Sequence, residues 1–463
     1  MSLASLQYAF TAGQCRIRGA GLPARHPMTS PSSTFRRPPG PKSPVELGID
    51  RPTLEALESL TAAHGPMVSV ERPNGRLAYF VNDPDEVRRI LVRRHPKYRK
   101  GPGFERVKML LGNGLIVSDG DAWRRSRTMI QPAFKTQNVH RLMKVMVLCA
   151  DERARRWAGI ARAGGSVNIT EETNEFALAL ILRSIFGRDY ERRDMRDNNP
   201  FGFLSEDSSR DLGVVMKVRE LRALLLEIIA DRRAGGEEEQ FDFLDMYLAA
   251  TDREGKPFSE RELLDELMTL IVAGFETSAN TLNWVWYLLA GHRDVEQKII
   301  DEAARYMPDV DAVTADNAQA MVYTQQVLEE TLRLYPPVWL FTRRAHEFDQ
   351  LDDYDVPAGT DIYLSPYLLH RTESLWPEPE RFDPERFAEG DQKKKDRPYF
   401  PFSLGPRRCL GEYFSFLEMK VHLALLLPRF RMERMQAEHP GLELAINLRS
   451  AEDIHLTVTE RTG

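Results

Sequence analysis

The 463-residue sequence has few cysteines, no long hydrophobic run and no excess of positive charge. Three cysteines cannot cross-link a chain of this length, which excludes a disulfide-built secreted scaffold and favours a reducing compartment. No run of about 18 apolar residues occurs, so we expect no membrane span. The formal net charge of −6 argues against a protein that binds nucleic acid through phosphate contacts.

The sequence does contain enough apolar residues to bury a large core. Hydrophobic residues make up 42% of the chain, which is far too many for a disordered protein. With the absences above, this composition predicts a soluble, globular, cytoplasmic protein. We expect it to be a monomer.

The first 45 residues differ in composition from the rest. They contain six basic residues and no acidic residue, and positions 28–44 are rich in proline and serine. Such a segment is typical of a disordered tail or of a targeting leader. The remaining residues show no internal repeat and no linker long enough to separate two folding units. We therefore predict a tail over 1–45 and one large domain over 46–463.

Helical patterns dominate this domain, and the strand signals are short. Residues 77–81 (LAYFV) predict a strand that leads into a helix, because Asp83 suits the cap position and Pro84 the first helical position. A second strand signal covers 355–364, with turn residues at 356–359. The fold class expected from these patterns is mainly α with small β-sheets.

The longest predicted helix covers residues 260–290. Ser259 and Glu262 form a capping box at its start, and Gly291 ends it. Its length of roughly 45 Å spans a whole domain, and its apolar middle must run through the core. Gly274 and the pair Glu276 and Thr277 are unfavourable inside such a helix. Either Gly274 gives room to a neighbouring helix, or a bound group lies there and uses the two polar side chains.

Cys409 has a sequence environment that the other two cysteines lack. Cys15 lies in the tail and Cys149 in a helical pattern, whereas Cys409 lies between Gly405 and Gly411, directly before a helix. The glycines allow a flat ligand to approach closely, and the helix start and the adjacent arginines favour a thiolate. Zinc would need further ligands at short spacing, and a cysteine nucleophile would leave the polar pair of the long helix unexplained. A single thiolate suffices as the axial ligand of haem iron.

These residues and four further segments resemble the cytochrome P450 family. Phe402, Gly405, Arg407, Cys409 and Gly411 match its haem-binding signature. The further segments occur in the order of that family: 123–127 (WRRSR), 273–278 (AGFETS), 330–333 (ETLR) and 384–387 (PERF). The resemblance covers residues 79–427 and implies a single large cytochrome P450 fold, with the long helix over the haem.

The resemblance implies haem b as the cofactor, with Cys409 as the ligand of its iron. Arg343 is expected at a haem propionate, and Arg344 is a near-equal alternative to it. Arg407 has a second interpretation, in which it only stabilises the thiolate charge. The residues expected at the cofactor besides Cys409 are Trp123, Arg127, Arg343, Arg407, Phe402, Gly405, Gly411, Ala273 and Gly274.

The resemblance also implies roles in proton delivery and in bracing the fold. Thr277 and Glu276 are the expected catalytic residues, since a hydroxyl group with a nearby carboxylate can deliver protons to a reacting oxygen. A structural role without proton transfer stays open for Glu276. Glu330, Arg333 and Arg386 are expected to form a structural ion-pair triad beneath the haem loop.

The expected substrate pocket is apolar. Thr269, Ala273 and Thr277 are four residues apart and therefore share one face of the long helix, with Val272 at its border. Val338, Leu340 and Phe341 are expected to form an apolar wall. Because no charged residue occurs in this set, the pocket predicts a small apolar substrate of terpenoid, fatty-acid, carotenoid or polyketide type.

The expected function is therefore that of a haem-thiolate monooxygenase. No glycine-rich dinucleotide or flavin segment occurs, so electrons must come from a separate ferredoxin or flavodoxin with an NAD(P)H reductase. A basic docking face is one interpretation of Lys393, Lys394, Lys395, Arg397, Arg407 and Arg408, and a solvated loop is another for the lysines. A peroxide-driven or rearranging haem-thiolate enzyme, or a non-catalytic haem-thiolate sensor, remains the alternative.

Overall fold

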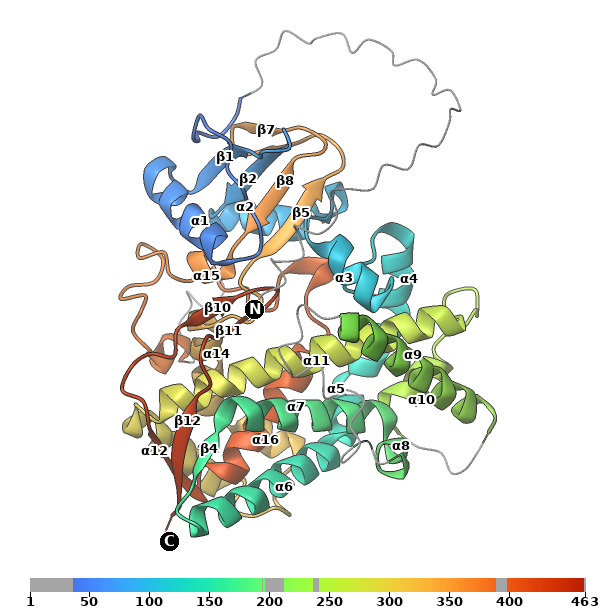
Figure 1. Cartoon of the computed structure of the whole chain (residues 1–463), viewed down its shortest axis with the longest axis vertical. Helices are drawn as coiled ribbons and strands as arrows, with labels where there is room; N and C mark the ends of the chain where they lie inside the picture. Colours follow the sequence, from blue (N-terminus) through green and yellow to red (C-terminus); the bar gives the residue numbers. More distant parts are fainter. Residues whose placement is uncertain (1–35, 194, 196–211, 236–240, 389–397, 462–463) are drawn as a thin grey trace.

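The computed structural model describes residues 36–193, 195, 212–235, 241–388 and 398–461. Helices form most of this part of the chain, and small sheets lie at one end and along one side (Figure 1), which confirms the predicted fold class. The helices are α1 (Arg51–His64), α2 (Pro84–Arg88), α3 (Phe104–Leu111), α4 (Gly120–Ile130), α5 (Thr136–Arg141), α6 (Met143–Arg162), α7 (Ile169–Phe186), α8 (Arg188–Arg192), α9 (Leu212–Arg233), α10 (Phe243–Ala249), α11 (Glu260–Leu289), α12 (Arg293–Tyr306), α13 (Ala315–Ala320), α14 (Val322–Leu334), α15 (Pro366–Leu369) and α16 (Glu412–Leu426). Within these ranges, no helix is both long enough and apolar enough to cross a lipid bilayer.

The strands form four sheets in the described ranges. They are β1 (Met67–Glu71), β2 (Leu77–Val81), β3 (Tyr98–Lys100), β4 (Ser166–Asn168), β5 (Phe341–Ala345), β6 (Asp349–Leu351), β7 (Tyr354–Val356), β8 (Asp361–Leu364), β9 (Phe430–Arg434), β10 (Leu442–Leu444), β11 (Leu448–Ser450) and β12 (His455–Glu460). The largest sheet has the order β1-β2-β8-β5-β3, in which only β2 and β8 are parallel neighbours. The others are β4-β12-β9, β6-β7 and β10-β11.

The local signals of the sequence are confirmed at β2 and α2. The strand has the predicted bounds, and Asp83 caps α2 by accepting hydrogen bonds from the backbone N–H groups of Asp85 and Glu86, both at 3.0 Å. The strand signal at 355–364 is confirmed in part, because the turn residues and the strand after them are present, but the residues before the turn belong to a strand of a different sheet. β7 and β8 are separated by a turn in which Gly359 has a positive φ of 92°.

Ten residues that the composition assigned to the tail make contacts with the domain. Residues 36–45, assigned to the tail from the sequence, pack along β1 and the β6–β7 hairpin. The Ser69 N–H donates to the carbonyl of Pro39 (3.0 Å), and the Val45 N–H donates to that of Glu71 (2.8 Å). Arg36 forms an ion pair with Asp353 (2.7 Å). The predicted boundary at residue 45 marks only a change in charge composition. Backbone hydrogen bonds to the domain are also formed by residues before this boundary.

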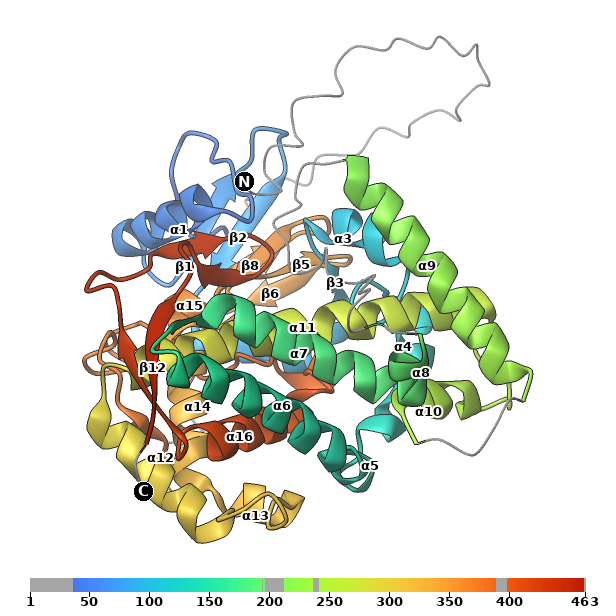
Figure 2. The ribbon, with the colours of Figure 1, turned by 60° about the horizontal axis from the view of Figure 1, so that its bottom comes forward.

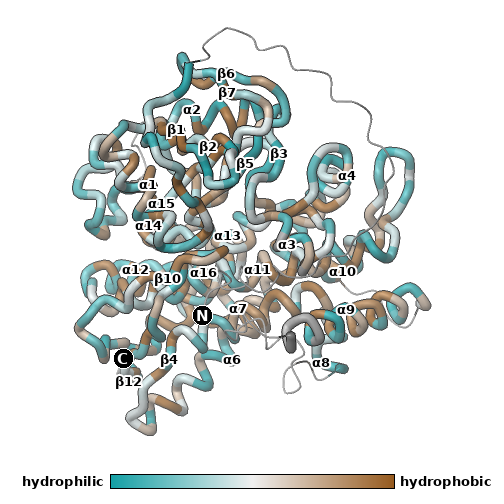
Figure 3. The backbone as a smooth tube through the Cα atoms, turned by 45° about the horizontal axis from the view of Figure 1, so that its top comes forward, coloured by the Kyte–Doolittle hydropathy of each residue, from teal (hydrophilic) through white to brown (hydrophobic). Residues whose placement is uncertain are grey.

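The α11 helix runs through the centre of the molecule, with α7 packed along it (Figure 2). Its start is the predicted capping box, in which the Ser259 N–H donates to the Glu262 carboxylate (2.8 Å) and the Glu262 N–H to Ser259 Oγ (3.3 Å). Trp284 and Trp286 near its end are fully buried. Figure 3 shows apolar positions concentrated around α7 and α11, so α11 is the axis of the core.

The glycine in the middle of α11 has a packing role. A Cβ atom at Gly274 would lie 2.8 Å from Cδ1 and Cγ1 of Ile181 on α7. A larger residue at position 274 would therefore require the Ile181 side chain to shift. This packing agrees with the interpretation in which Gly274 gives room to a neighbouring helix, and the interpretation in which a bound group uses Glu276 and Thr277 stays a prediction.

Candidate functional site

The Cys409 loop is held in a tight conformation directly before α16. Its backbone turns at Gly405, which has a φ of 69° and whose missing Cβ would lie 2.4 Å from the carbonyl oxygen of Leu91. The Cys409 N–H donates to the carbonyl of Phe402 (3.0 Å), which closes the loop. The side chain of Cys409 is exposed, and the N–H groups of Gly411 and Glu412 point at its sulfur. The loop therefore presents one sulfur outward at the start of a helix.

The charge balance around Cys409 differs from the sequence expectation. The enclosing protein raises the pKa of the Cys409 thiol, and this effect outweighs the hydrogen bond from the Gly411 N–H and the charge of Arg127, which lower it. The net direction is opposite to the expected preference for a thiolate. The main cause is that the surrounding protein displaces water from the sulfur, and the nearby charge of Glu412 adds to it. Arg407 and Arg408 form ion pairs with Asp119 and Glu412.

A cluster of four cationic side chains lies beside this loop. Burial lowers the pKa of each of them, and Arg407 adds repulsion to the other three. The pKa of Arg343 is lowered to about 10. Asp119 is the carboxylate whose charge acts on three of the four. The members of this cation cluster are Lys100, Arg127, Arg343 and Arg407.

Secondary structure explains how these cations come together. Lys100 on β3 and Arg343 on β5 are direct partners in the antiparallel register of the large sheet. Arg127 is on α4 and donates to the carbonyl of Arg408 (2.9 Å). Trp123, one turn earlier on α4, is 8% exposed and lies beneath the Arg407 guanidinium, whose carbon is 4.3 Å from the ring centroid. Sheet, helix and Cys409 loop thus converge at one place.

The structure distinguishes Arg343 from its neighbour Arg344. Arg344 donates to the carboxylate of Asp361 at 2.6 Å and belongs to the outer part of the sheet. Arg343 is only 4% exposed, and its guanidinium donates to the carbonyl of Thr342 (2.8 Å). Arg343 therefore belongs to the cation cluster and Arg344 does not.

This cluster fits the cofactor that the sequence implied. Burial of several like charges is unfavourable unless anions compensate them. The four cations and Asp119 leave three positive charges uncompensated within the cluster. Haem b carries two propionates, and their carboxylates supply negative charge of the kind that this cluster needs. Sequence reasoning missed Lys100 and Asp119.

The two polar residues of α11, Glu276 and Thr277, have different surroundings. The Thr277 hydroxyl donates to the carbonyl of Ala273 one turn earlier (3.0 Å). Glu276 lies next to the β10–β11 hairpin, where Asn447 donates to it. Burial raises the pKa of Glu276, while this hydrogen bond and the charge of Arg449 lower it. The two side chains thus have separate partners, and Glu276 is held by a segment 170 residues later in the chain.

The expected substrate-facing residues form a less uniform surface than predicted. Along α11, Val272, Ala273 and Thr277 are half-buried, whereas Thr269 is 6% exposed and lies against Gly114. The wall expected from the segment 338–341 is divided. Leu340 packs in the main core, and Phe341 packs in a second apolar cluster, where its ring lies 6.1 Å from that of Phe400. Val338, which precedes both in the sequence, is half-buried.

The three residues expected to brace the fold are joined in the structure. Arg333 and Glu330 are fully buried and form an ion pair at 2.7 Å, which Arg386 joins at 3.4 Å from Glu330. Arg333 also donates to three backbone carbonyl groups, at distances of 2.7 to 3.1 Å. Its donors are thus used to hold the segment 370–381 against α14. These carbonyl groups belong to His370, Pro379 and Arg381.

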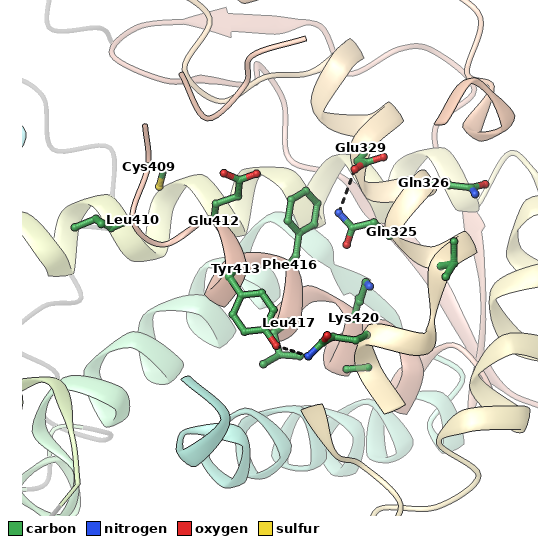
Figure 4. Close-up of a pocket in the computed structure, with 13 residues that line it drawn as sticks. Gln325, Gln326, Glu329, Cys409, Leu410, Glu412, Tyr413, Phe416, Leu417 and Lys420 are labelled. Atoms are coloured by element: carbon green, nitrogen blue, oxygen red, sulfur yellow. Dashed lines mark hydrogen bonds between the residues drawn. The ribbon is translucent and has the colours of Figure 1, made fainter. Parts of the chain in front are cut away.

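A cavity of about 560 Å³ lies next to Cys409 on the side of α13, α14 and α16 (Figure 4). Lys420 is at its base, and burial lowers the pKa of this amine to about 8. Glu329 and Glu412 also line the cavity, so this surface is of mixed charge rather than basic. Of the basic face expected from the sequence, positions 393–395 and 397 lie outside the described residues. Arg407 and Arg408 are engaged in the ion pairs given above.

Comparison with known proteins identifies one family. A family model described as Cytochrome P450 matches residues 45–206 and 198–449. Cyclooctatin synthase of Streptomyces melanosporofaciens is 32% identical over 409 residues, which are 82% of this chain and 86% of that protein. Cyclooctat-9-en-7-ol 5-monooxygenase of the same organism is 31% identical, over 90% of this chain and 94% of its own length. The protein LUTEIN DEFICIENT 5 of Arabidopsis thaliana is 28% identical over 83% and 70% of the two chains.

Solved structures show the same fold. The haem domain of cytochrome P450DA superposes with a TM-score of 0.79 at 25% identity, and the match covers 89% of this chain and 93% of that domain. A second cytochrome P450 superposes with a TM-score of 0.82 at 22% identity, over 92% and 99% of the two chains.

Proposed function

This chain belongs to the cytochrome P450 family of haem-thiolate monooxygenases, and on that premise we propose that it oxidises an apolar substrate of terpenoid type. Haem b is the cofactor of this family, and a cysteine thiolate is the ligand of its iron. When bound, the haem supplies the redox chemistry that activates dioxygen. The proposals below concern what the residues of this chain do around it.

We assign iron ligation to Cys409. Its sulfur is exposed at the start of α16, whereas Cys149 is buried in α6, where burial raises the pKa of its thiol to about 11 and Arg183 donates to it at 3.3 Å. A metal ligand needs an accessible sulfur, and Cys409 has one. The close approach of Gly405 to the Leu91 backbone supports the assignment, because it fixes the position of the loop that would lie against the haem. Phe402 and Gly411 complete this loop.

The cation cluster carries the proposal. Lys100, Arg127, Arg343 and Arg407 would bind the propionates through charge-assisted hydrogen bonds, and the indole N–H of Trp123 would add a neutral donor. These contacts would compensate the buried charges that otherwise repel one another. A protein without an anionic ligand at this place would have no electrostatic reason to hold four cations together, of which Arg343 is buried and the other three are half-buried.

Thr277 and Glu276 are the proposed catalytic residues. Because Thr277 donates its proton to the Ala273 carbonyl, its oxygen can accept a hydrogen bond from water and hold that water in the pocket. The raised pKa of Glu276 means that it keeps a proton at higher pH than an exposed glutamate does. Glu276 would thus supply protons from the side of the β10–β11 hairpin, and Thr277 would position the water molecule that receives them.

The proposed substrate class follows from the residues expected to line the pocket and from the name of one relative. Thr269, Val272, Ala273, Val338, Leu340 and Phe341 offer no charge to a substrate. Cyclooctat-9-en-7-ol 5-monooxygenase, by its name, acts on an alkenol. We infer a small, largely apolar substrate with few oxygen atoms. Members of this family take electrons from redox partners, and we propose a ferredoxin or flavodoxin with an NAD(P)H reductase for this chain.

Turnover with a terpenoid panel tests this function. The holoenzyme is mixed with a ferredoxin, its reductase, NADPH and one candidate substrate, such as cyclooctat-9-en-7-ol or a fatty acid of similar carbon number. We expect a product heavier by one oxygen atom with the terpenoid alcohol, and incorporation of label from ¹⁸O₂. Product formed with hydrogen peroxide but not with dioxygen would establish the peroxide-driven alternative. Turnover of the fatty acid alone would refute the substrate class.

A further inference from the structure

Two adjacent carboxylates on α11 hold the loop that connects α3 to α4. The Asn113 N–H donates to Asp265 Oδ2 at 2.9 Å, and the Leu115 N–H donates to Glu266 Oε2 at 2.9 Å. Asp265 is 4% exposed and Glu266 3% exposed. Buried carboxylates that accept backbone hydrogen bonds fix the position of that backbone strongly. The loop 112–118 therefore has one fixed register along α11.

Two glycines permit this close contact. Gly112 has a φ of 81°, and a Cβ atom there would lie 2.0 Å from Asp265 Oδ1. A Cβ atom at Gly114 would lie 2.2 Å from Thr269 Oγ1 and 2.5 Å from the Asp265 carbonyl oxygen. Residues with side chains would lift the loop off the helix. The contact lies beside Thr269, two turns before Thr277 on α11.

The other end of the same loop reaches the cation cluster. Asp119 follows the loop directly, forms the ion pair with Arg407 and accepts the backbone N–H of Lys100 at 2.9 Å. In between, Val117 and Ser118 are buried. The loop thus extends from the part of α11 that is expected to face the substrate to the proposed propionate site.

Asp265 also binds a third element, α9. Arg222 Nη2 lies 2.8 Å from Asp265 Oδ1, while Asp265 Oδ2 accepts the Asn113 N–H. One carboxylate therefore uses one oxygen for α9 and the other for the loop. Figure 2 shows α9 crossing α11 at the end where α3 and α4 lie. The Arg222 side chain is 28% exposed, so solvent reaches this link from outside.

We propose that Asp265 is a positioning residue that couples α9 to the 112–118 loop and thereby sets the width of the substrate side of the haem pocket. This rests on the proposed haem site, because the pocket edge is defined by Cys409 and the cation cluster. With the Arg222–Asp265 ion pair intact, α9 and the loop move together. Without it, each moves separately, and the pocket opens more often.

Four variants separate the two links. Arg222→Ala removes the link to α9 and leaves the loop contact. Asp265→Asn removes the charge but keeps an oxygen for the Asn113 N–H, and Asp265→Ala removes both links. The matched control is Arg233→Ala, which removes another ion pair between α9 and α11, from Arg233 to Glu260 at 3.9 Å, far from the loop.

Two measurements are made on each purified holoenzyme. Hydrogen exchange with mass spectrometry reports the opening rate of the amides at 112–118. Stopped-flow absorbance reports the rate at which 4-phenylimidazole, used as the probe, reaches the haem iron. The absorbance of the carbon monoxide complex verifies that each variant has kept its haem. The exchange measurement does not depend on haem, so a failure of the proposed function would show in the spectra alone.

We expect Arg222→Ala to speed exchange of the 112–118 amides by roughly two- to tenfold, although Arg222 does not touch them. Asp265→Asn should have a similar effect, and Asp265→Ala a larger one. The association rate of 4-phenylimidazole should rise in the same order, and Arg233→Ala should change neither quantity.

If Arg222→Ala leaves loop exchange and probe association at their wild-type values, α9 is not coupled to the loop and the proposal is wrong. An equal response to Arg233→Ala would also overturn it, since any loosening of α9 would then suffice. Should Asp265→Ala not fold, the other variants still decide the question.

Discussion

Replacement of Arg343 by methionine should have opposite effects on the haem-free and haem-bound protein. Methionine is of similar length and apolar, so it fills the site without the buried charge. Burial and the repulsion of Arg407 lower the pKa of Arg343 from its usual value to about 10. At about 1.4 kcal/mol per pKa unit, the charged side chain is disfavoured by about 3 kcal/mol in the polypeptide alone.

The haem-free Arg343→Met variant should therefore be more stable than the wild type, by at most about 3 kcal/mol, because some packing of the guanidinium is lost. The haem-bound variant should lose a charge-assisted contact worth about 1.5–3 kcal/mol, which corresponds to haem release roughly ten- to a hundredfold faster. Urea denaturation measures the first effect. Transfer of haem to excess apomyoglobin measures the second.

Arg344→Met is the matched control at the adjacent position. Arg344 pairs with the fully buried Asp361, so its loss should destabilise the haem-free protein and leave haem release unchanged. The reasoning is refuted if Arg343→Met lowers the stability of the haem-free protein as Arg344→Met does. It is equally refuted if the two variants release haem at the same rate.

Three further predictions concern the interior of the fold. Glu330→Ala leaves Arg333 buried without its carboxylate, so the free energy of unfolding in urea should fall by about 3–5 kcal/mol, and a loss below about 1 kcal/mol would contradict the bracing role. Burial raises the pKa of Glu418 to about 8, so the native state binds a proton that the unfolded state releases above about pH 4.5. Stability should therefore fall as the pH rises from about 4.5 to 8, by at most about 1.4 kcal/mol per pH unit for this group. Glu418→Gln should flatten that slope, and an unchanged slope would show that Glu418 is already ionised. Thr277→Ala should keep haem and substrate binding but divert reducing equivalents to hydrogen peroxide, and full coupling of NADPH to product would exclude the role in proton positioning.

The sequence allowed the local features of the fold and site to be predicted. The capping box at Ser259, the strand at 77–81 and the turn-rich loop around Cys409 depend on neighbours within a few residues. Such contacts are encoded in short patterns. Glu330 and Arg333, one helical turn apart, belong to the same class, since i, i+3 spacing places them side by side.

The features that were missed depend on contacts between distant segments. Lys100 enters the cation cluster because β3 pairs with β5, more than 240 residues later, and no local pattern reveals that register. Asp265 and Glu266 look like ordinary charges on the first turns of a helix until the 112–118 loop is placed on them. The hydrogen bond from Asn447 to Glu276 also joins two segments that are distant in the sequence, so no local pattern predicts it. The effect of the surrounding protein on Cys409, which raises the pKa of its thiol, likewise depends on distant segments that pack around the loop.

The carbon monoxide spectrum of the reduced protein tests the assignment of Cys409 most directly. It is recorded for the wild type, for a variant with both Cys15 and Cys149 replaced by alanine, and for Cys409→Ser. Cys409 as the iron ligand predicts the red-shifted Soret band of thiolate ligation in the first two proteins and its loss in the third. The same red-shifted band in Cys409→Ser, or its loss when only Cys15 and Cys149 are replaced, would contradict the assignment.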